Sequence, residues 1–203
     1  MLIKKTKSMK LRKLLVIGIA AALLSGCGFN PEKVETTTVR ILEDGTLTQI
    51  VVDDFDKDYY DFDEFSKMAS SEVTAFNIAN GENSAVIKDI IKNDDSVKTI
   101  MTFDSDDDYA LFNGSTFFYG TVNEMLDAGF SLPGDMVSRD GDAIDADSFY
   151  DKEEQHVIVV SEKINIVAPY KIEYMSSGTE LVNSKEADLS NVSDSLVYLL
   201  LVK

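Results

Sequence analysis

The sequence predicts an α+β fold: a largely antiparallel sheet with a main helix (about 62–79) and two short helices packed on it. Short β-prone runs outnumber helical segments and follow one another in pairs separated by turns. The strand–helix–strand alternation that is typical of parallel sheets is weak. A hydrophobic content of 44% is enough to bury a core, which excludes a wholly disordered chain.

Two pairs of strands are expected in the first half of the chain. Residues 36–42 and 47–52 are rich in Thr, Val and Ile, and Gly45 lies in the turn between them. Glycine tolerates the positive φ that hairpin turns require. A second pair is expected at 84–92 and 96–103, where the same residue types recur on both sides of a polar turn.

The main helix has both a start and a stop signal. Asp61, followed three residues later by Glu64, matches a capping box, and Gly81 is a suitable C-terminal stop. Between them, apolar residues recur at steps of three and four: Phe62, Phe65, Ala69, Val73 and Phe76. This spacing predicts a single apolar helix face, which we expect to pack on the core.

The second half of the chain is expected to contain two short helices, at 106–112 and 121–128, on either side of an aromatic strand at 115–120. Residues 131–155 are rich in Asp and Gly and predict a long loop, which in a compact domain is usually functional or mobile. Strands are then expected at 156–161, 164–168, 170–176 and 196–202. The last is a continuous apolar run, which predicts a strand buried on both faces.

The first 26 residues have the pattern of an export signal. Six basic and no acidic residues occur there, and the apolar run Leu14–Leu24 follows the basic segment. Eleven residues at about 1.5 Å each span only ~16 Å, against a hydrocarbon core of ~30 Å, so this run is too short for a membrane-spanning helix.

The run closes on Leu24, Ser25, Gly26 and Cys27, which resembles the lipobox of bacterial lipoproteins. The resemblance implies that residues 1–26 are a signal peptide, recognised by its peptidase through Leu24, Ser25 and Gly26. It implies that Cys27 carries a diacylglyceryl anchor and becomes the first residue of the mature chain. Two acyl chains hold a protein stably on a membrane, here the extracytoplasmic face of the cell membrane.

Residues 27–35 would then be the lipidated cysteine and a short tether, and 36–203 a single α+β domain. A subdivision near 130–155 is the alternative. Cys27 is the only cysteine, so the domain has no disulfide and depends on packing. With the signal removed, 13 basic residues face 36 acidic ones, a net charge of −23. Such a surface repels nucleic acid and anionic lipid and suits cations or cationic partners. The simpler explanation of the charge is that it keeps the protein soluble in a crowded envelope.

Two acidic clusters have the spacing of the first ligands of a calcium-binding EF-hand: Asp54, Asp56 and Asp58, and Asp104, Asp106 and Asp108. In the first cluster, Tyr59 stands where the loop needs glycine and Phe65 where it needs a bidentate glutamate. In the second, Tyr109 and Ser115 stand at those positions. Neither is an EF-hand. Aspartate is also favoured at helix N-termini, which accounts for both clusters without a metal.

His156 is the only histidine, and it opens a predicted strand. Catalytic triads and most zinc sites need a histidine beside a nucleophile or further ligands. No Gly-x-Ser-x-Gly motif, phosphate loop or dinucleotide fingerprint occurs. We therefore expect His156 to be a structural or surface residue, and we assign no catalytic, cofactor-binding or metal-binding residue and no cofactor.

The segment Asp108–Val122, together with the Asp-Gly hairpin and the stretch Phe55–Tyr60, resembles uncharacterised lipoproteins of low-GC Gram-positive bacteria. This resemblance covers most of 36–203 and concerns the general layout. It implies the same location on the cell membrane, and it implies no activity, ligand or functional residue.

These patterns predict a non-enzymatic interaction or accessory module of the cell envelope. Its partners would be the membrane, through the N-terminal anchor, and an envelope protein, with no role for nucleic acid. The contact surface would be the acidic face or the 131–155 loop. The alternatives are an envelope hydrolase that uses paired carboxylates and a lipoprotein that binds a cation or a small molecule. Two converging, desolvated carboxylates in a cleft would favour the hydrolase, and carboxylates that face water would favour the module.

Overall fold

The computed structural model describes residues 29–144, 148 and 152–203. The chain divides into two compact units, Met1–Asn30 and Pro31–Lys203. Within the described residues, the second unit contains the whole buried core, from Val39 to Leu201. It therefore has the packing of a domain that folds by itself. No helix in the described part of the chain is both long and apolar enough to cross a membrane.

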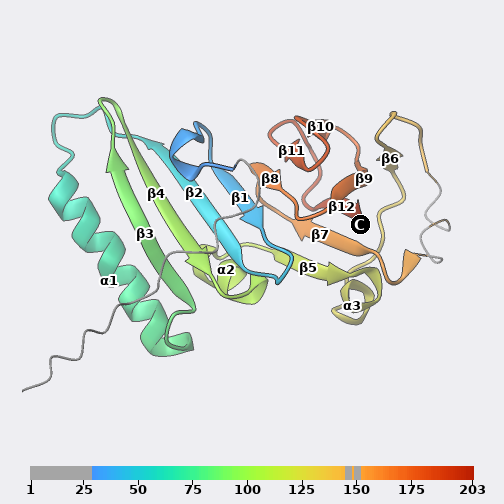
Figure 1. Cartoon of the computed structure of the whole chain (residues 1–203), viewed down its shortest axis with the longest axis horizontal. Helices are drawn as coiled ribbons and strands as arrows, with labels where there is room; N and C mark the ends of the chain where they lie inside the picture. Colours follow the sequence, from blue (N-terminus) through green and yellow to red (C-terminus); the bar gives the residue numbers. More distant parts are fainter. Residues whose placement is uncertain (1–28, 145–147, 149–151) are drawn as a thin grey trace, which may run out of the picture. The chain divides into compact units, whose positions relative to one another are not determined.

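The predicted α+β class is confirmed, with two sheets in place of the one that the sequence predicted (Figure 1). The described residues of the second unit form three α-helices, a short 3₁₀ helix and twelve strands. Most strands pair antiparallel, and helices lie beside the sheets. The second sheet arises because strands from the C-terminal third pair among themselves and with one central strand.

The first sheet has seven strands. In spatial order they are β10 (Glu180–Leu181), β11 (Glu186–Asp188), β8 (Asn165–Val167), β1 (Thr38–Ile41), β2 (Leu47–Asp54), β4 (Ser96–Phe103) and β3 (Ala85–Lys92). Both predicted hairpins, β1–β2 and β3–β4, are confirmed. Gly45 has φ +87° in the first turn, a conformation that favours glycine. The pair β1–β8 is parallel, and all other pairs are antiparallel.

The second sheet is antiparallel and has five strands. In spatial order they are β5 (Phe117–Thr121), β7 (His156–Val160), β12 (Val197–Val202), β9 (Lys171–Ser176) and β6 (Met136–Ser138). The prediction that the last strand is buried on both faces is confirmed, because β12 lies between β7 and β9 and Val197–Leu201 are all buried.

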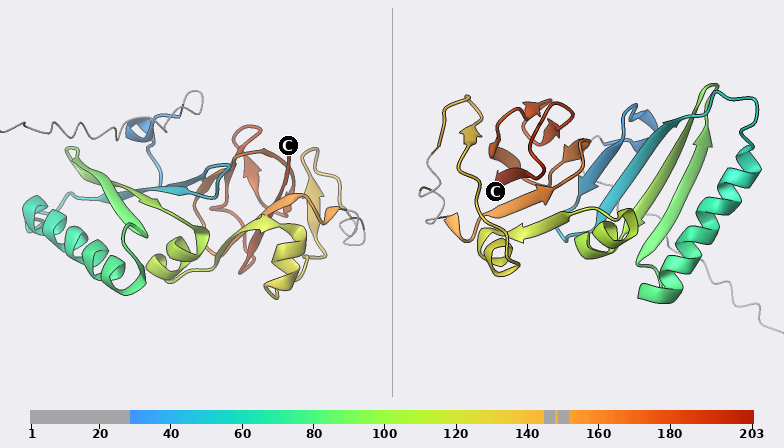
Figure 2. Two further views of the ribbon diagram at one scale, coloured as in Figure 1. Left: turned by 60° about the horizontal axis from the view of Figure 1, so that its bottom comes forward. Right: turned by 180° about the vertical axis from the view of Figure 1, so that it is seen from behind.

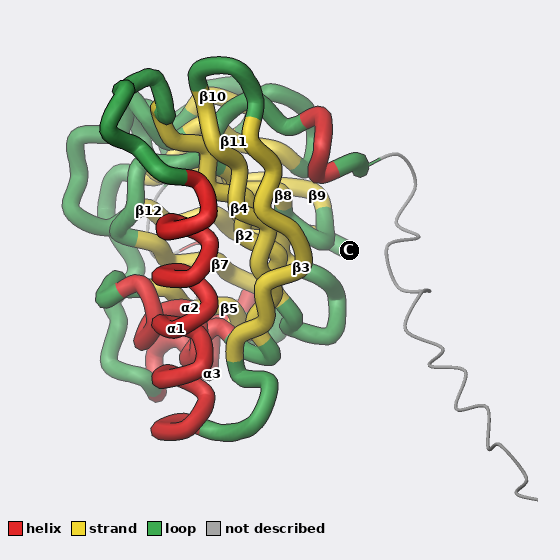
Figure 3. The backbone as a smooth tube through the Cα atoms, turned by 90° about the vertical axis from the view of Figure 1, so that its left-hand side faces the viewer, coloured by secondary structure: helices red, strands yellow, loops and turns green. Residues whose placement is uncertain are grey.

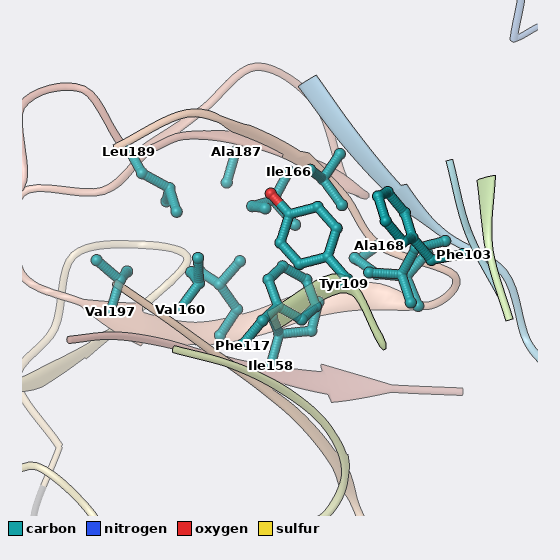
Figure 4. Close-up of a cluster of buried hydrophobic side chains, with 14 of the residues drawn as sticks. Phe103, Tyr109, Phe117, Ile158, Val160, Ile166, Ala168, Ala187, Leu189 and Val197 are labelled. Carbon is teal, nitrogen blue, oxygen red and sulfur yellow. The ribbon is translucent and has the colours of Figure 1, made fainter. Parts of the chain in front are cut away.

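Two hydrophobic clusters cover the two faces of this second sheet. Alternate residues of β7 point to opposite clusters: Ile158 and Val160 to the larger, Val157 and Val159 to the smaller. The larger cluster also includes side chains of the seven-stranded sheet and of the helix that follows β4, with Tyr109 at its centre (Figure 4). A strand buried on both faces requires apolar residues at consecutive positions, which explains the runs seen in the sequence.

The prediction of a long loop at 131–155 is wrong in part, because residues 136–138 form strand β6. Met136 is fully buried there, and Phe130, Leu132 and Ile144 pack on the same smaller cluster. These apolar residues are spaced irregularly, so they gave no periodic signal. They nevertheless fix much of the segment onto the second sheet.

Three α-helices complete the unit: α1 (Phe62–Asn80), α2 (Asp106–Asn113) and α3 (Val122–Asp127). The predicted N-cap of α1 is present, since the backbone N–H of Glu64 donates to the Asp61 side chain. Thr121 and Glu124 form a complete capping box at the start of α3. Helix α1 lies against the edge strand β3. The 3₁₀ helix η1 (Pro31–Lys33) lies on the opposite side of the seven-stranded sheet from α1 (Figure 2), where Lys98 of β4 donates to the carbonyl of Glu32.

Candidate functional site

The loop that joins β2 to α1 is anchored by a buried aromatic residue. The backbone N–H of Phe55 donates to the carbonyl of Asp95 at 2.8 Å, which ties the loop to the β3–β4 turn. The Phe55 ring contacts Phe62 and Phe65 at the start of α1, with centroid distances of 6.5 and 5.8 Å. Lys92 lies over the ring at 5.3 Å. These contacts give the loop a defined position beside the first turn of α1.

Two tyrosines project from this anchored loop. Tyr59 is 77% exposed and Tyr60 is 41% exposed, and their ring centroids lie 4.9 Å apart in an edge-to-face pair. Tyr60 also contacts Phe55 at 5.0 Å, so the buried ring supports the exposed pair. Exposed aromatic rings on a supported loop are a common feature of protein contact surfaces, because they bring large contact areas at little cost in side-chain entropy.

Helix α1 has a second apolar face beyond the one that the sequence predicted. Its inner residues, which include the buried Val73, face β3. Its outer side carries Met68 and Ile78, which are 53% and 82% exposed. With Ser71 and Ala75 they are spaced by three, four and three residues, and they lie about 140–220° around the helix from Val73. We call Met68, Ser71, Ala75 and Ile78 the α1 strip.

No other described element covers the α1 strip. Figure 3 views the molecule from the side of α1, and within the described chain the helix stands in front of its neighbours. On the adjoining flank of the helix, the hydroxyls of Ser70 and Thr74 donate to backbone carbonyls four residues earlier, at 2.7 Å each. This flank is therefore polar but internally hydrogen-bonded, and the apolar strip has a defined border.

The sequence of the loop and of α1 is strongly acidic. Residues 53–82, which include the loop and the whole of α1, contain nine acidic side chains and two basic ones, Lys57 and Lys67. The acidic residues are Asp53, Asp54, Asp56, Asp58, Asp61, Asp63, Glu64, Glu72 and Glu82. Lys57 is paired with its neighbour Asp56 at 2.6 Å. An exposed apolar strip with an acidic surround is the combination that would contact a cationic, partly apolar partner.

Members of both aspartate clusters make contacts within the fold. In the first cluster Asp56 pairs with Lys57, and Asp61, which follows this cluster, caps α1. In the second cluster, Asp108 accepts from the hydroxyl of Ser105, which is the N-cap of α2. Among the described residues no group of three or more His, Cys, Asp or Glu side chains is arranged to hold a metal ion. Asp61 and Asp108 therefore take part in helix capping.

Asp106 is the carboxyl that burial affects most clearly. Burial raises its pKa, while the backbone N–H of Tyr119, which donates to it at 2.7 Å, acts in the opposite direction. That N–H belongs to β5, an edge strand of the second sheet, and points away from β7. Asp106 therefore satisfies a backbone donor that the sheet leaves unpaired, which is a structural role.

His156 lies in a cluster of aromatic rings. Its ring centroid is 5.4 Å from that of Tyr119 and 5.3 Å from that of Tyr170. Lys203 lies over the Tyr170 ring at 4.9 Å. Burial lowers the pKa of His156, Lys203 lowers it further, and Glu124 opposes both. A half-buried imidazole between two phenol rings, with its pKa held down, fits the structural role that the sequence predicted.

The predicted lipidation residue Cys27 and the peptidase-recognition residues Leu24, Ser25 and Gly26 lie outside the described residues. The interpretation of residues 1–27 as signal and anchor stays a prediction from the sequence. The α1 strip was not predicted. Its signal was present in the sequence as a second set of residues at helical spacing, but the stronger inner stripe of Phe and Val concealed it.

No family model, curated protein or solved structure matches this chain. The proposals below depend on the sequence patterns and on the contacts described above.

Proposed function

We propose that this protein is a lipid-anchored, extracytoplasmic lipoprotein that acts as a non-enzymatic interaction module of the cell envelope. The observation that carries the proposal is the exposed tyrosine pair, Tyr59 and Tyr60, held by a buried phenylalanine within an acidic loop beside an uncovered helix face. Exposed aromatic residues that a rigid scaffold supports are favourable for binding a partner. The N-terminal export signal and Cys27 support the location.

The short link between Cys27 and the folded unit is suited to a module that stays close to the membrane. Only three residues separate Cys27 from Pro31, where the folded unit begins, so an extended chain would place Pro31 within about 14 Å of the lipidated residue. In the folded unit, η1 and α1 lie on opposite sides of the seven-stranded sheet (Figure 2). Anchoring through Cys27 would keep the folded unit close to the bilayer.

The contacts of the carboxylates support the module over the hydrolase. Asp106, whose pKa burial raises, is occupied by a backbone N–H, and its neighbour Asp108 by a serine hydroxyl. A carboxylate pair that acts on a glycosidic bond needs two carboxyl groups facing a common substrate. The side chains of Asp106 and Asp108 instead satisfy hydrogen-bond donors of the fold itself.

The location can be tested by metabolic labelling with a palmitate analogue. We expect the wild-type chain to incorporate the label and the Cys27→Ala variant to lose it and accumulate as an uncleaved precursor or in released form. A Ser25→Ala variant is the matched control, because alanine keeps a small residue before the cysteine. Labelling that persists in Cys27→Ala would refute the anchor.

The interaction can be tested in intact cells by site-specific photocrosslinking. A photoreactive benzoylphenylalanine at position 59 should yield a crosslinked protein adduct. The control is the same group at position 182. Val182 is exposed and lies between β10 and β11, at the edge of the seven-stranded sheet opposite to β3. An adduct from position 59 and none from position 182 supports the proposal. Equal yields, or no adduct from position 59, would refute it.

A further inference from the structure

We infer that the α1 strip binds a basic amphipathic helix of a partner protein. The partner helix would lie along α1, with its apolar side chains on the strip and its basic side chains near acidic residues of the loop and of α1. This inference depends on the proposed function and specifies its partner. It concerns the outer face of α1, whereas the proposal above requires only that the loop at Tyr59 contacts a protein.

The spacing of the strip is that of a helix–helix seam. Met68, Ser71, Ala75 and Ile78 follow the three-four-three pattern of the a and d positions of a heptad repeat. Met68 and Ile78 are separated by ten residues, about 15 Å along the helix axis. The two large side chains therefore stand at the ends of the strip, and the two small ones between them would let a partner helix approach closely. A strip of this length could contact about three turns of a second helix.

The charge around the strip identifies the chemistry of the partner. Asp63, Glu64 and Glu72 lie on α1 itself, and Lys67 is the only basic residue of the helix. At its C-terminal end, Glu82 follows directly after the cap. Acidic side chains near an apolar seam favour a partner helix that carries lysine or arginine beside its own apolar ridge.

The same charges disfavour the other occupants of an apolar helix face. A second copy of this chain would bring a second set of nine acidic and two basic residues against residues 53–82, which repel it. An anionic membrane surface would be repelled in the same way. A basic helix gains from these charges, and its apolar ridge covers Met68 and Ile78, which are otherwise in contact with water.

The test uses the fragment 28–203, which contains the entire buried core of the described chain. The probe is an 18-residue leucine–lysine peptide designed as an amphipathic helix, labelled for fluorescence anisotropy. The first control is a peptide of the same composition, scrambled so that its leucines form no helical face. The second is the corresponding leucine–glutamate peptide. We expect the amphipathic basic peptide to bind about tenfold more tightly than the scrambled one, and we expect no binding of the acidic peptide.

The variant Met68→Gln/Ile78→Gln should weaken binding of the amphipathic peptide about tenfold, since it removes both large apolar contacts of the strip. Val182→Gln is the matched control, because Val182 is 56% exposed but lies at the opposite edge of the sheet. It should leave the affinity unchanged. Circular dichroism of each variant confirms that the fold is retained, as expected for substitutions on exposed positions.

Three outcomes would overturn the inference. The scrambled peptide could bind as well as the amphipathic one, which would indicate attraction by net charge alone. The double variant could bind as well as the wild type, which would place the contact elsewhere. The fragment could form a dimer that Met68→Gln/Ile78→Gln dissociates, which would make the strip a self-association face. Any of these results, combined with a crosslink from position 59, would leave the proposed function standing and remove only the inference about its partner.

Discussion

The substitution Tyr109→Phe tests how the two sheets are held together. Tyr109 lies in α2, is fully buried, and stands at the centre of the larger core cluster (Figure 4). Its hydroxyl donates to Oε2 of Glu162 at 2.8 Å, and Glu162 follows β7 of the second sheet. This hydrogen bond therefore links α2, which follows β4 of the seven-stranded sheet, to the turn after β7 of the five-stranded sheet.

The expected loss of stability follows from the contacts that remain. In Tyr109→Phe the ring keeps its edge-to-face contacts with Phe103 at 5.3 Å and Phe117 at 4.8 Å. Only the hydrogen bond to a carboxylate is lost, which costs about 1.5–3 kcal/mol. Glu162 keeps a second donor, the hydroxyl of Ser115 at 3.0 Å, so it is not left unsatisfied. We therefore expect a decrease of about 1.5–2 kcal/mol in the free energy of unfolding.

Urea denaturation of the fragment 28–203, followed by circular dichroism, would measure this decrease. The wild type and Tyr109→Phe should also differ in alkaline solution. Burial raises the pKa of Tyr109 above its ordinary value of 10.0, and the charge of Glu162 raises it further. The unfolded state therefore loses its proton first as pH rises, and the wild type should lose stability above about pH 10 while the phenylalanine variant lacks this component. A variant as stable as the wild type at pH 7, with a parallel alkaline profile, would show that the bond does not form.

Three further predictions concern the second sheet and α3. The pKa of His156 is lowered in the folded state, so the unfolded state takes up a proton first as pH falls below about 6.5. The wild type should therefore lose more stability than His156→Gln between pH 7 and 5. Urea midpoints that change in parallel for the two proteins would contradict this. In Gly120→Ala, the new Cβ would lie 2.7 Å from Cζ of Phe118 and 2.9 Å from Oε2 of Glu124. Both side chains would have to shift, which should disturb the capping box and lower the melting temperature. Gly134→Ala is the control, because the space around Gly134 is open, and it should leave the melting temperature unchanged. Removal of the cap itself in Thr121→Ala should lower the free energy of unfolding by about 1 kcal/mol, and an unchanged urea midpoint would show that the box contributes nothing.

The local features of the fold could be predicted because a few neighbouring residues determine them. Asp61 begins α1 and Gly81 ends it, since a capping side chain and a glycine at the terminus act within one turn. The strand β12 was recognisable because its residues form a continuous apolar run, which is typical of a strand covered on both faces. Its five consecutive buried residues agree with this. These signals depend on no distant part of the chain.

The pairing of distant strands could not be predicted in the same way. Thr38 of β1 lies beside Asn165 of β8 in parallel register, across more than 120 residues, and no local pattern specifies that partner. The strands β6, β10 and β11 have three, two and three residues. Segments of that length are strands only because a longer neighbour supplies the hydrogen bonds. The division into two sheets follows from these long-range choices.

The candidate contact surface shows the same limit. The sequence showed that α1 has an apolar inner face and that residues 53–63 are acidic with interspersed aromatic residues. It did not show that α1 lies against the edge strand β3, which leaves the outer face of the helix without a covering element among the described residues. Exposure of Met68 and Ile78 is a property of that placement, and the same residues would be part of a core if another element lay over them.

Solubility alone is the simpler explanation of the acidic region, and a specific contact is the alternative to it. Single exposed apolar residues are normal on protein surfaces, and acidic residues keep a protein soluble wherever they occur. Those two facts do not require Met68 and Ile78 to share one helix face. They also do not require a supported tyrosine pair within the same acidic region.

The two explanations differ in their dependence on salt. A contact of charge alone should vanish at high ionic strength, whereas a basic amphipathic helix should keep the part of its affinity that comes from covering Met68 and Ile78. Residual binding of the leucine–lysine peptide in 0.5 M salt, lost in Met68→Gln/Ile78→Gln, would decide between them.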